Sequence, residues 1–143
     1  MPDSTTVFTY HAIDNRDSVI SVSPELFCRQ MKLLAENGIR GVSLEQALLP
    51  GQAPQRSVAL TFDDGYLSVF EQALPVMKAL GFSGTVFIPT DLVGLSCQEA
   101  QRINRDIDRD MMEWRELERL NESGFEIAAH AKTHPDLTRL SPN

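Results

Sequence analysis

The chain has 143 residues, of which 42% are apolar and 23% are charged. This length and composition are typical of one folded domain and exclude a disordered chain. The formal net charge of −7 argues against nucleic acid and anionic polymers as partners. No apolar run approaches the roughly 18 residues of a transmembrane segment. The amino terminus lacks the basic segment and apolar core of a signal peptide, and the compartment stays open.

Strands and helices are expected to alternate along the chain. Gly and Pro residues divide it into segments, and the spacing of the apolar residues is typical of a strand in some segments and of a helix in others. Ser23 and Pro24 are typical of a helix start, and Gly38 of its stop. This alternation predicts parallel βα units and an α/β fold. The expected strands are 7–10, 57–62, 84–89 and 125–129; the expected helices run from 24 up to 38 and over 43–48, 66–80 and 112–121; a turn is expected at 50–54 and a long loop over 91–112.

Two residues inside the expected helices carry more specific predictions. Pro75 is expected to kink helix 66–80 or to open a second helical segment, because proline disrupts a helix interior. Trp114 falls on one side of helix 112–121 together with Leu117 and Leu120. We therefore expect Trp114 to be a core residue.

Polar residues gather where the expected strands end. Asp63 and Asp64 follow strand 57–62, and His130 follows strand 125–129, with His134 four residues later. His11 follows the first strand, where it is expected to contact the site or its substrate. Because reacting groups of parallel βα folds lie at the carboxyl ends of the strands, these residues are expected to meet at one edge of the sheet.

A carboxylate and two imidazoles suit one divalent metal with a coordination position left for water. Such a donor set favours zinc, cobalt, nickel or iron over calcium. A second carboxylate beside the metal is then free to accept a proton from water, whose pKa falls to about 7 on zinc. Neighbouring residues of a strand point to opposite faces, so Asp63 and Asp64 need not share a role. The combination predicts metal-assisted hydrolysis.

Each motif alone has another interpretation. Two histidines in a loop often have no role, and Pro135 disfavours the helical conformation that would place them on one face. Asp63 and Asp64 also suit a turn and a helix N-cap before Tyr66. Their placement at matching strand ends is what favours a site.

The motifs Leu60-Thr61-Phe62-Asp63-Asp64-Gly65-Tyr66 and His130-x-x-x-His134-Pro135 together resemble those of polysaccharide deacetylases with a NodB-homology domain, carbohydrate esterase family 4. Tyr10-His11 more loosely resembles the start of poly-N-acetylglucosamine deacetylases. The resemblance implies the N-terminal part of a distorted (β/α) barrel. It also implies a metal-dependent enzyme that removes N-acetyl groups from a carbohydrate.

The resemblance also implies the roles of single residues. Asp63 would be the general base, and Asp64, His130 and His134 would hold the metal, with zinc as the first expectation. The family's later motifs, which include a histidine that acts as general acid, have no counterpart before Asn143. Ser141 and Pro142 are typical of a helix start. These two observations predict that residues 1–143 form a single domain that is truncated at its C-terminus.

Two alternatives to this function remain open at this stage. The site could hydrolyse a small amide, or the chain could be a metal-binding or sugar-binding module without turnover. With no general acid among its residues, the chain alone is expected to bind metal and to deacetylate poorly. A partial barrel would also expose strand edges, and a homodimer that covers them is one expected arrangement.

Overall fold

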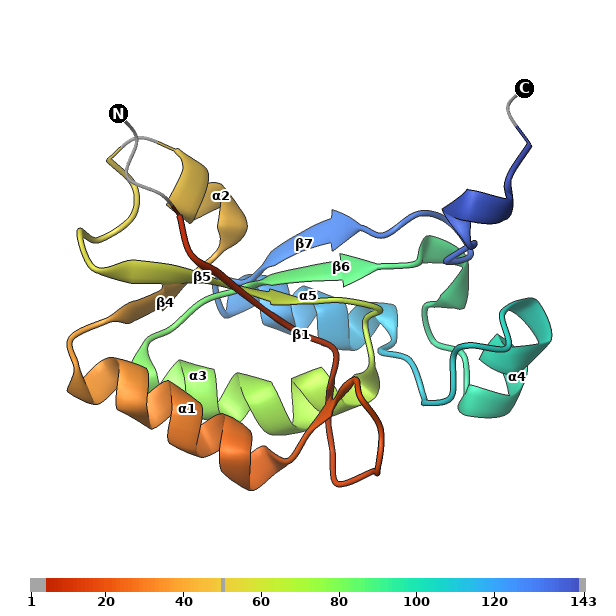
Figure 1. The fold of residues 1–143 in the computed structure, drawn as a ribbon, viewed down its shortest axis with the longest axis horizontal. Helices are drawn as coiled ribbons and strands as arrows, with labels where there is room; N and C mark the ends of the chain where they lie inside the picture. Colours follow the sequence, from red (N-terminus) through yellow and green to blue (C-terminus); the bar gives the residue numbers. More distant parts are fainter. Residues whose placement is uncertain (1–4, 50, 142–143) are drawn as a thin grey trace.

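The computed structural model describes residues 5–49 and 51–141 and has the parallel α/β arrangement expected from the sequence (Figure 1). Strands expected at 7–10, 57–62, 84–89 and 125–129 are all present. The strands are β1 (Val7–Tyr10), β2 (Ala12–Ile13), β3 (Ser21–Val22), β4 (Arg40–Val42), β5 (Ser57–Phe62), β6 (Thr85–Ile88) and β7 (Glu126–Ala129).

Strand β5 is the centre of the main sheet. It pairs in parallel with β1 along residues 59–62, with β4 along residues 57–59, and with β6 along residues 61–62. Strand β7 pairs in parallel with β6, and β2 and β3 form a separate two-stranded ribbon. Because β1, β5, β6 and β7 run in the same direction, the residues that follow them gather at one edge of the sheet (Figure 1).

Helices cover the sheet, and several begin where the sequence predicts. The Ser23 side chain caps α1, and Ser43 forms a capping box with Gln46 at the start of α2. Figure 1 shows α1 and α3 side by side along one face of the sheet. The helices are α1 (Pro24–Glu36), α2 (Leu44–Leu48), α3 (Leu74–Leu80), α4 (Cys97–Ile103) and α5 (Trp114–Glu122), with a π-helical turn η1 (Val69–Ala73) and 3₁₀ turns η2 (Thr90–Leu92) and η3 (Leu137–Arg139).

The helix expected over 66–80 is divided at Pro75, as predicted. The π-helical turn η1 precedes α3, and the Leu74 N–H donates to the carbonyl of Val69. A proline ring clashes with the carbonyl four residues before it, and the wider π turn absorbs this clash. Gly81 closes α3 with a φ of 65°.

The prediction of a long loop over 91–112 is wrong, because this segment contains η2 and α4. Ser96 and Glu99 form a capping box at the start of α4. This Ser-x-x-Glu pattern is the sequence signal for the helix. The short strands β2, β3 and β4 were also not expected, because two or three residues carry too little periodicity to predict a strand.

Trp114 is not a core residue, because its side chain is 61% exposed while Leu117 and Leu120 are buried. A helix turns about 100° per residue, which places Trp114 about 120° around α5 from Leu120. Trp114 begins α5 and lies outside its buried stripe. Within the described residues, no helix has the length and apolar character needed to cross a membrane.

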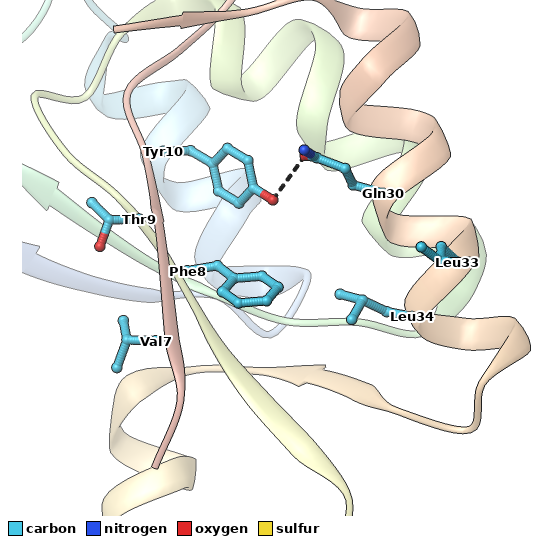
Figure 2. Close-up of a pocket in the computed structure, with 7 residues that line it drawn as sticks. All are labelled: Val7, Phe8, Thr9, Tyr10, Gln30, Leu33 and Leu34. Carbon is cyan, nitrogen blue, oxygen red and sulfur yellow. Dashed lines mark hydrogen bonds between the residues drawn. The ribbon is translucent and has the colours of Figure 1, made fainter.

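An apolar groove of about 530 Å³ lies between β1 and α1 (Figure 2). Phe8, Leu33 and Leu34 line it, and the Tyr10 hydroxyl donates to Oε1 of Gln30 over 3.0 Å. In the described part of the chain, β1 pairs only with β5 and has a second, unpaired edge. The homodimer that would cover such an edge stays a prediction.

Two further expectations fall on residues at the limits of the described ranges. Gly51 lies in a turn with a φ of 77°, as expected, whereas Pro50 lies outside the described residues. The helix start at Ser141 and Pro142 also cannot be followed, because Pro142 lies outside the described residues.

Candidate metal centre

The end of β5 places Asp64 in a buried position. The Asp63 N–H donates to the Tyr10 carbonyl over 2.9 Å and so continues the pairing of β5 with β1. Asp64 and Gly65 then turn the chain with φ angles of 69° and 71°. A Cβ at Gly65 would lie 3.2 Å from Cγ2 of Ile88, so the turn needs both the conformational freedom and the small size of glycine.

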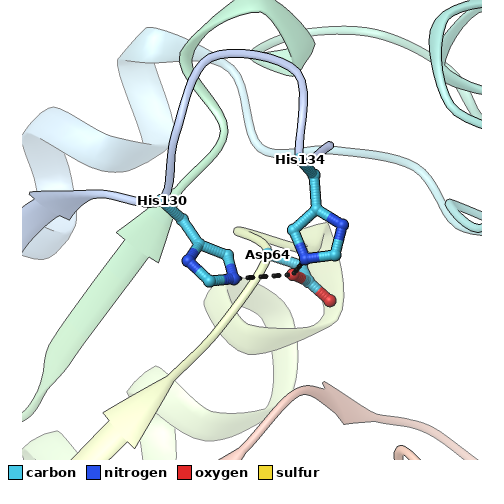
Figure 3. A group of neighbouring side chains, drawn as sticks. All are labelled: Asp64, His130 and His134. Carbon is cyan, nitrogen blue, oxygen red and sulfur yellow. Dashed lines mark ion pairs between the residues drawn. The ribbon is translucent and has the colours of Figure 1, made fainter. Parts of the chain in front are cut away.

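The end of β7 carries both histidines on one tight loop. The His130 N–H donates to the Ile88 carbonyl over 2.7 Å, which extends the pairing of β7 with β6 by one residue. Ala131 and His134 then adopt φ angles of 59° and 53°. These left-handed conformations cost of order 1–3 kcal/mol each in non-glycine residues. They bend the loop so that His134 returns towards Asp64 (Figure 3).

The three expected metal ligands meet at one point (Figure 3). Nε2 of His134 lies 3.2 Å from Oδ1 of Asp64, and Nε2 of His130 lies 3.6 Å from the same oxygen. One potential ligand atom from each residue lies within 4.8 Å of the others. These residues come from the ends of β5 and β7, so the fold assembles the site.

The donor set fits a divalent metal ion. Oδ1 of Asp64 is buried and accepts no hydrogen bond within the described residues. A buried carboxylate oxygen without a partner is costly and needs an explanation. A cation between this oxygen and two imidazole nitrogens supplies one, and mixed nitrogen and oxygen ligands suit zinc and related transition metals.

Asp63 lies beside this group and outside it. Its Oδ2 is 3.8 Å from Nε2 of His11, and both side chains are partly exposed. Burial raises the pKa of the Asp63 carboxyl above its usual value, against the opposing effect of the nearby His11 imidazole. The structure thus gives the two adjacent aspartates different surroundings and places His11 next to the predicted base.

Tyr66 is a buried neighbour of the site that the sequence reasoning did not include. It is 1% exposed, and burial and the Asp64 carboxylate raise its pKa. Residues 110–112 pair with the segment around Tyr66. Tyr66 forms an antiparallel bridge with Met111, and the Met112 N–H donates to the Gly65 carbonyl over 3.0 Å. The loop before α5 therefore supports the turn that carries Asp64.

Arg109 anchors that loop. Arg109 is 3% exposed, and its side chain donates to Asp14 over 2.7 Å, to Ser21 over 2.6 Å, and to Asp108. Its guanidinium also lies 5.5 Å from the centre of the Tyr66 ring. Burial alone would raise the pKa of Asp14, but hydrogen bonds from Arg109 and Ser21 lower it to about 2.

Comparisons with known proteins agree with the motifs. The profile of the family described as polysaccharide deacetylase matches residues 51–143. A poly-β-1,6-N-acetyl-D-glucosamine N-deacetylase of Staphylococcus aureus is 34% identical over 127 residues, which are 86% of this chain and 40% of the relative. The chain spans about half the length of the curated relatives that it matches.

Solved structures support the same fold. The structure of IcaB from Ammonifex degensii matches with a TM-score of 0.73 and 28% identity, over 90% of this chain and 53% of that one. The Streptococcus pyogenes deacetylase PplD matches with a TM-score of 0.77 over 99% of this chain and 62% of that one. Its 22% identity supports the fold alone. The expected fold class, the parallel α/β arrangement of a NodB-type (β/α) barrel, is confirmed.

Proposed function

Because this chain belongs to the polysaccharide deacetylase family, we propose that its site removes N-acetyl groups from a carbohydrate with the help of a divalent metal. Asp64, His130 and His134 hold the metal, with zinc as the first candidate and cobalt, nickel or iron as alternatives. Asp63 is the general base, and His11 contacts the substrate beside it.

The observation that carries this proposal is the buried Oδ1 of Asp64. It accepts no hydrogen bond within the described residues, yet two imidazole nitrogens lie 3.2 and 3.6 Å away. Asp64 and His134 both adopt left-handed backbone conformations in this arrangement. Strain of this kind gathers where a function requires it, which supports a ligand-binding role for the cluster.

The residues of the site have separate roles in the proposed hydrolysis. When bound, a divalent metal polarises a carbonyl oxygen and makes water acidic enough to attack at neutral pH. The partly exposed carboxylate of Asp63 would accept a proton from the attacking water, and its position outside the ligand group supports this role.

The proposed substrate is a polymer or oligomer that contains N-acetylglucosamine. The name of the Staphylococcus aureus relative specifies such a polymer, and the chain shares a third of its residues over the matched region. The net charge of −7 also suits a substrate that is neutral when acetylated and cationic afterwards. We further propose that residues 1–143 behave as one domain, since one hydrophobic cluster joins β1, α1, β5, α3 and α5.

Acetate release from N-acetylglucosamine oligomers tests the reaction, and metal content after dialysis tests the site. Acetate release is measured with the 143-residue protein and with its Asp64→Asn variant under the same conditions. We expect one metal per chain and slow acetate release, both abolished in Asp64→Asn. Release of ammonia or acid from small amides alone would favour a different amidohydrolase. Metal binding without any turnover would favour a metal-binding or sugar-binding module over an enzyme.

A further inference from the structure

The loop that carries the two histidines is held through four consecutive carbonyl groups. The carbonyls of Ala131 and Lys132 accept hydrogen bonds from the backbone N–H groups of Thr90 and Asp91. The next two carbonyls, of residues 133 and 134, accept from the side-chain amide of a single residue, Asn104. The half of the loop that ends at His134 therefore depends on a side chain that lies on another element.

Asn104 is itself fixed in place by the end of α4. Its N–H donates to the Ala100 carbonyl over 2.8 Å and caps the helix. Its Oδ1 accepts from the Asp106 N–H over 2.9 Å, which leaves Nδ2 pointing away from α4. Nδ2 donates to the carbonyls of Thr133 over 3.2 Å and His134 over 2.5 Å. Both ends of the amide are thus occupied.

The two histidines differ in how the backbone supports them. The His130 N–H continues the β6–β7 pairing, so the sheet positions this residue. His134 has a φ of 53° and precedes Pro135, which has no N–H to donate. A left-handed residue in front of proline is unfavourable by itself and needs contacts that maintain it. The hydrogen bonds from Asn104 are contacts of this kind.

We infer that Asn104 is a positioning residue that fixes the His134 backbone and thereby the third ligand of the metal site. This inference rests on the proposed metal-binding function. Groups that orient metal ligands typically change metal affinity about 10- to 100-fold when they are removed. The role falls on residue 104 because α4 ends beside the histidine loop.

The test measures binding of Co²⁺ alone, by its visible absorption and by competition with a chelator. Asn104→Asp keeps the size of the side chain and the acceptor for Asp106 but removes both Nδ2 hydrogen bonds. Asn104→Ala removes them without adding charge. Gln101→Ala, an exposed residue on the same helix, is the matched control. Thermal unfolding of each metal-free variant shows whether the fold persists.

We expect both Asn104 variants to bind Co²⁺ about 10-fold or more weakly and to change its absorption bands. Their metal-free unfolding temperatures should stay close to that of the wild type, and Gln101→Ala should match the wild type in every measurement. Wild-type affinity and spectra in both Asn104 variants would overturn this inference alone. So would a loss of affinity that merely follows a general loss of folding. Failure of the wild-type protein to bind Co²⁺ would instead overturn the proposed metal site and this inference with it.

Discussion

Nε2 of His134 lies 3.2 Å from Oδ1 of Asp64, although the two residues follow different strands and both have left-handed backbone. Two such conformations facing each other across a buried oxygen are not explained by packing, because each raises the free energy of the fold. The proposed cation between them would account for the burial of this oxygen and for its missing hydrogen bond within the described residues.

The first prediction concerns the metal ligands. His130→Ala and His134→Ala should each lose most of the one metal ion expected per chain, since each removes one of the three proposed protein ligands. Elemental analysis after dialysis against metal-free buffer measures this loss. His11→Ala is the control and should keep its metal, because His11 lies beside Asp63 and outside the ligand group. Full metal content in both histidine variants would rule out this site.

The second prediction separates the two adjacent aspartates. Asp63→Asn should retain the metal and reduce turnover about 10²- to 10⁴-fold, because an amide of the same size cannot accept a proton. Metal content and acetate release, measured on the same preparation, distinguish binding from catalysis. If Asp63→Asn loses metal while Asp64→Asn keeps it, the two roles are reversed.

The sequence predicted that Asp64, His130 and His134 lie close together, because the fold determines where strand ends meet. Asp64 comes after β5, which contains the apolar run Val58-Ala59-Leu60, and His130 directly follows β7. Parallel strands bring their carboxyl ends to one edge, so a correct strand assignment was sufficient to predict that the two groups approach each other. The left-handed conformations of Asp64 and His134 have no such pattern, because only glycine signals them reliably.

The supporting residues could not be predicted in the same way. Asn104 and Arg109 lie in a segment that was expected to be a loop, and their partners lie on distant parts of the chain. A capping box at Ser96 and Glu99 signals α4, but nothing in the sequence indicates where the end of that helix points. Such contacts depend on tertiary packing. The prediction that Trp114 is a core residue was wrong for a local reason. Its position at the start of α5 leaves it outside the buried stripe of that helix.

The third prediction concerns the turn after Asp64. Gly65→Ala should lower the free energy of unfolding by about 1–3 kcal/mol and weaken metal binding, because the methyl group adds left-handed strain and crowds Ile88. Denaturant unfolding and metal affinity check the two effects. Gly124→Ala is the matched control, with a φ of 88° and no atom within 4 Å of the added Cβ. It should show the strain and leave metal affinity unchanged; equal effects on affinity would contradict the prediction.

The last prediction concerns pH and the ion pair between Asp14 and Arg109, which join over 2.7 Å. The folded pKa of Asp14 is lowered to about 2 from 3.8, so its contribution to stability is fully present above pH 3.8 and is lost as the pH falls through about 2. The shift corresponds to about 2 kcal/mol, since one pKa unit is worth about 1.4 kcal/mol. Asp14→Asn should therefore be less stable than the wild type at neutral pH, and the difference should shrink between pH 4 and pH 2, in the range set by those two pKa values. Denaturant unfolding over this pH range measures the difference, and Asp17→Asn, an exposed position in the same segment, should show little effect. A difference between wild type and Asp14→Asn that is independent of pH would mean that the Asp14 charge does not stabilise the loop behind Tyr66.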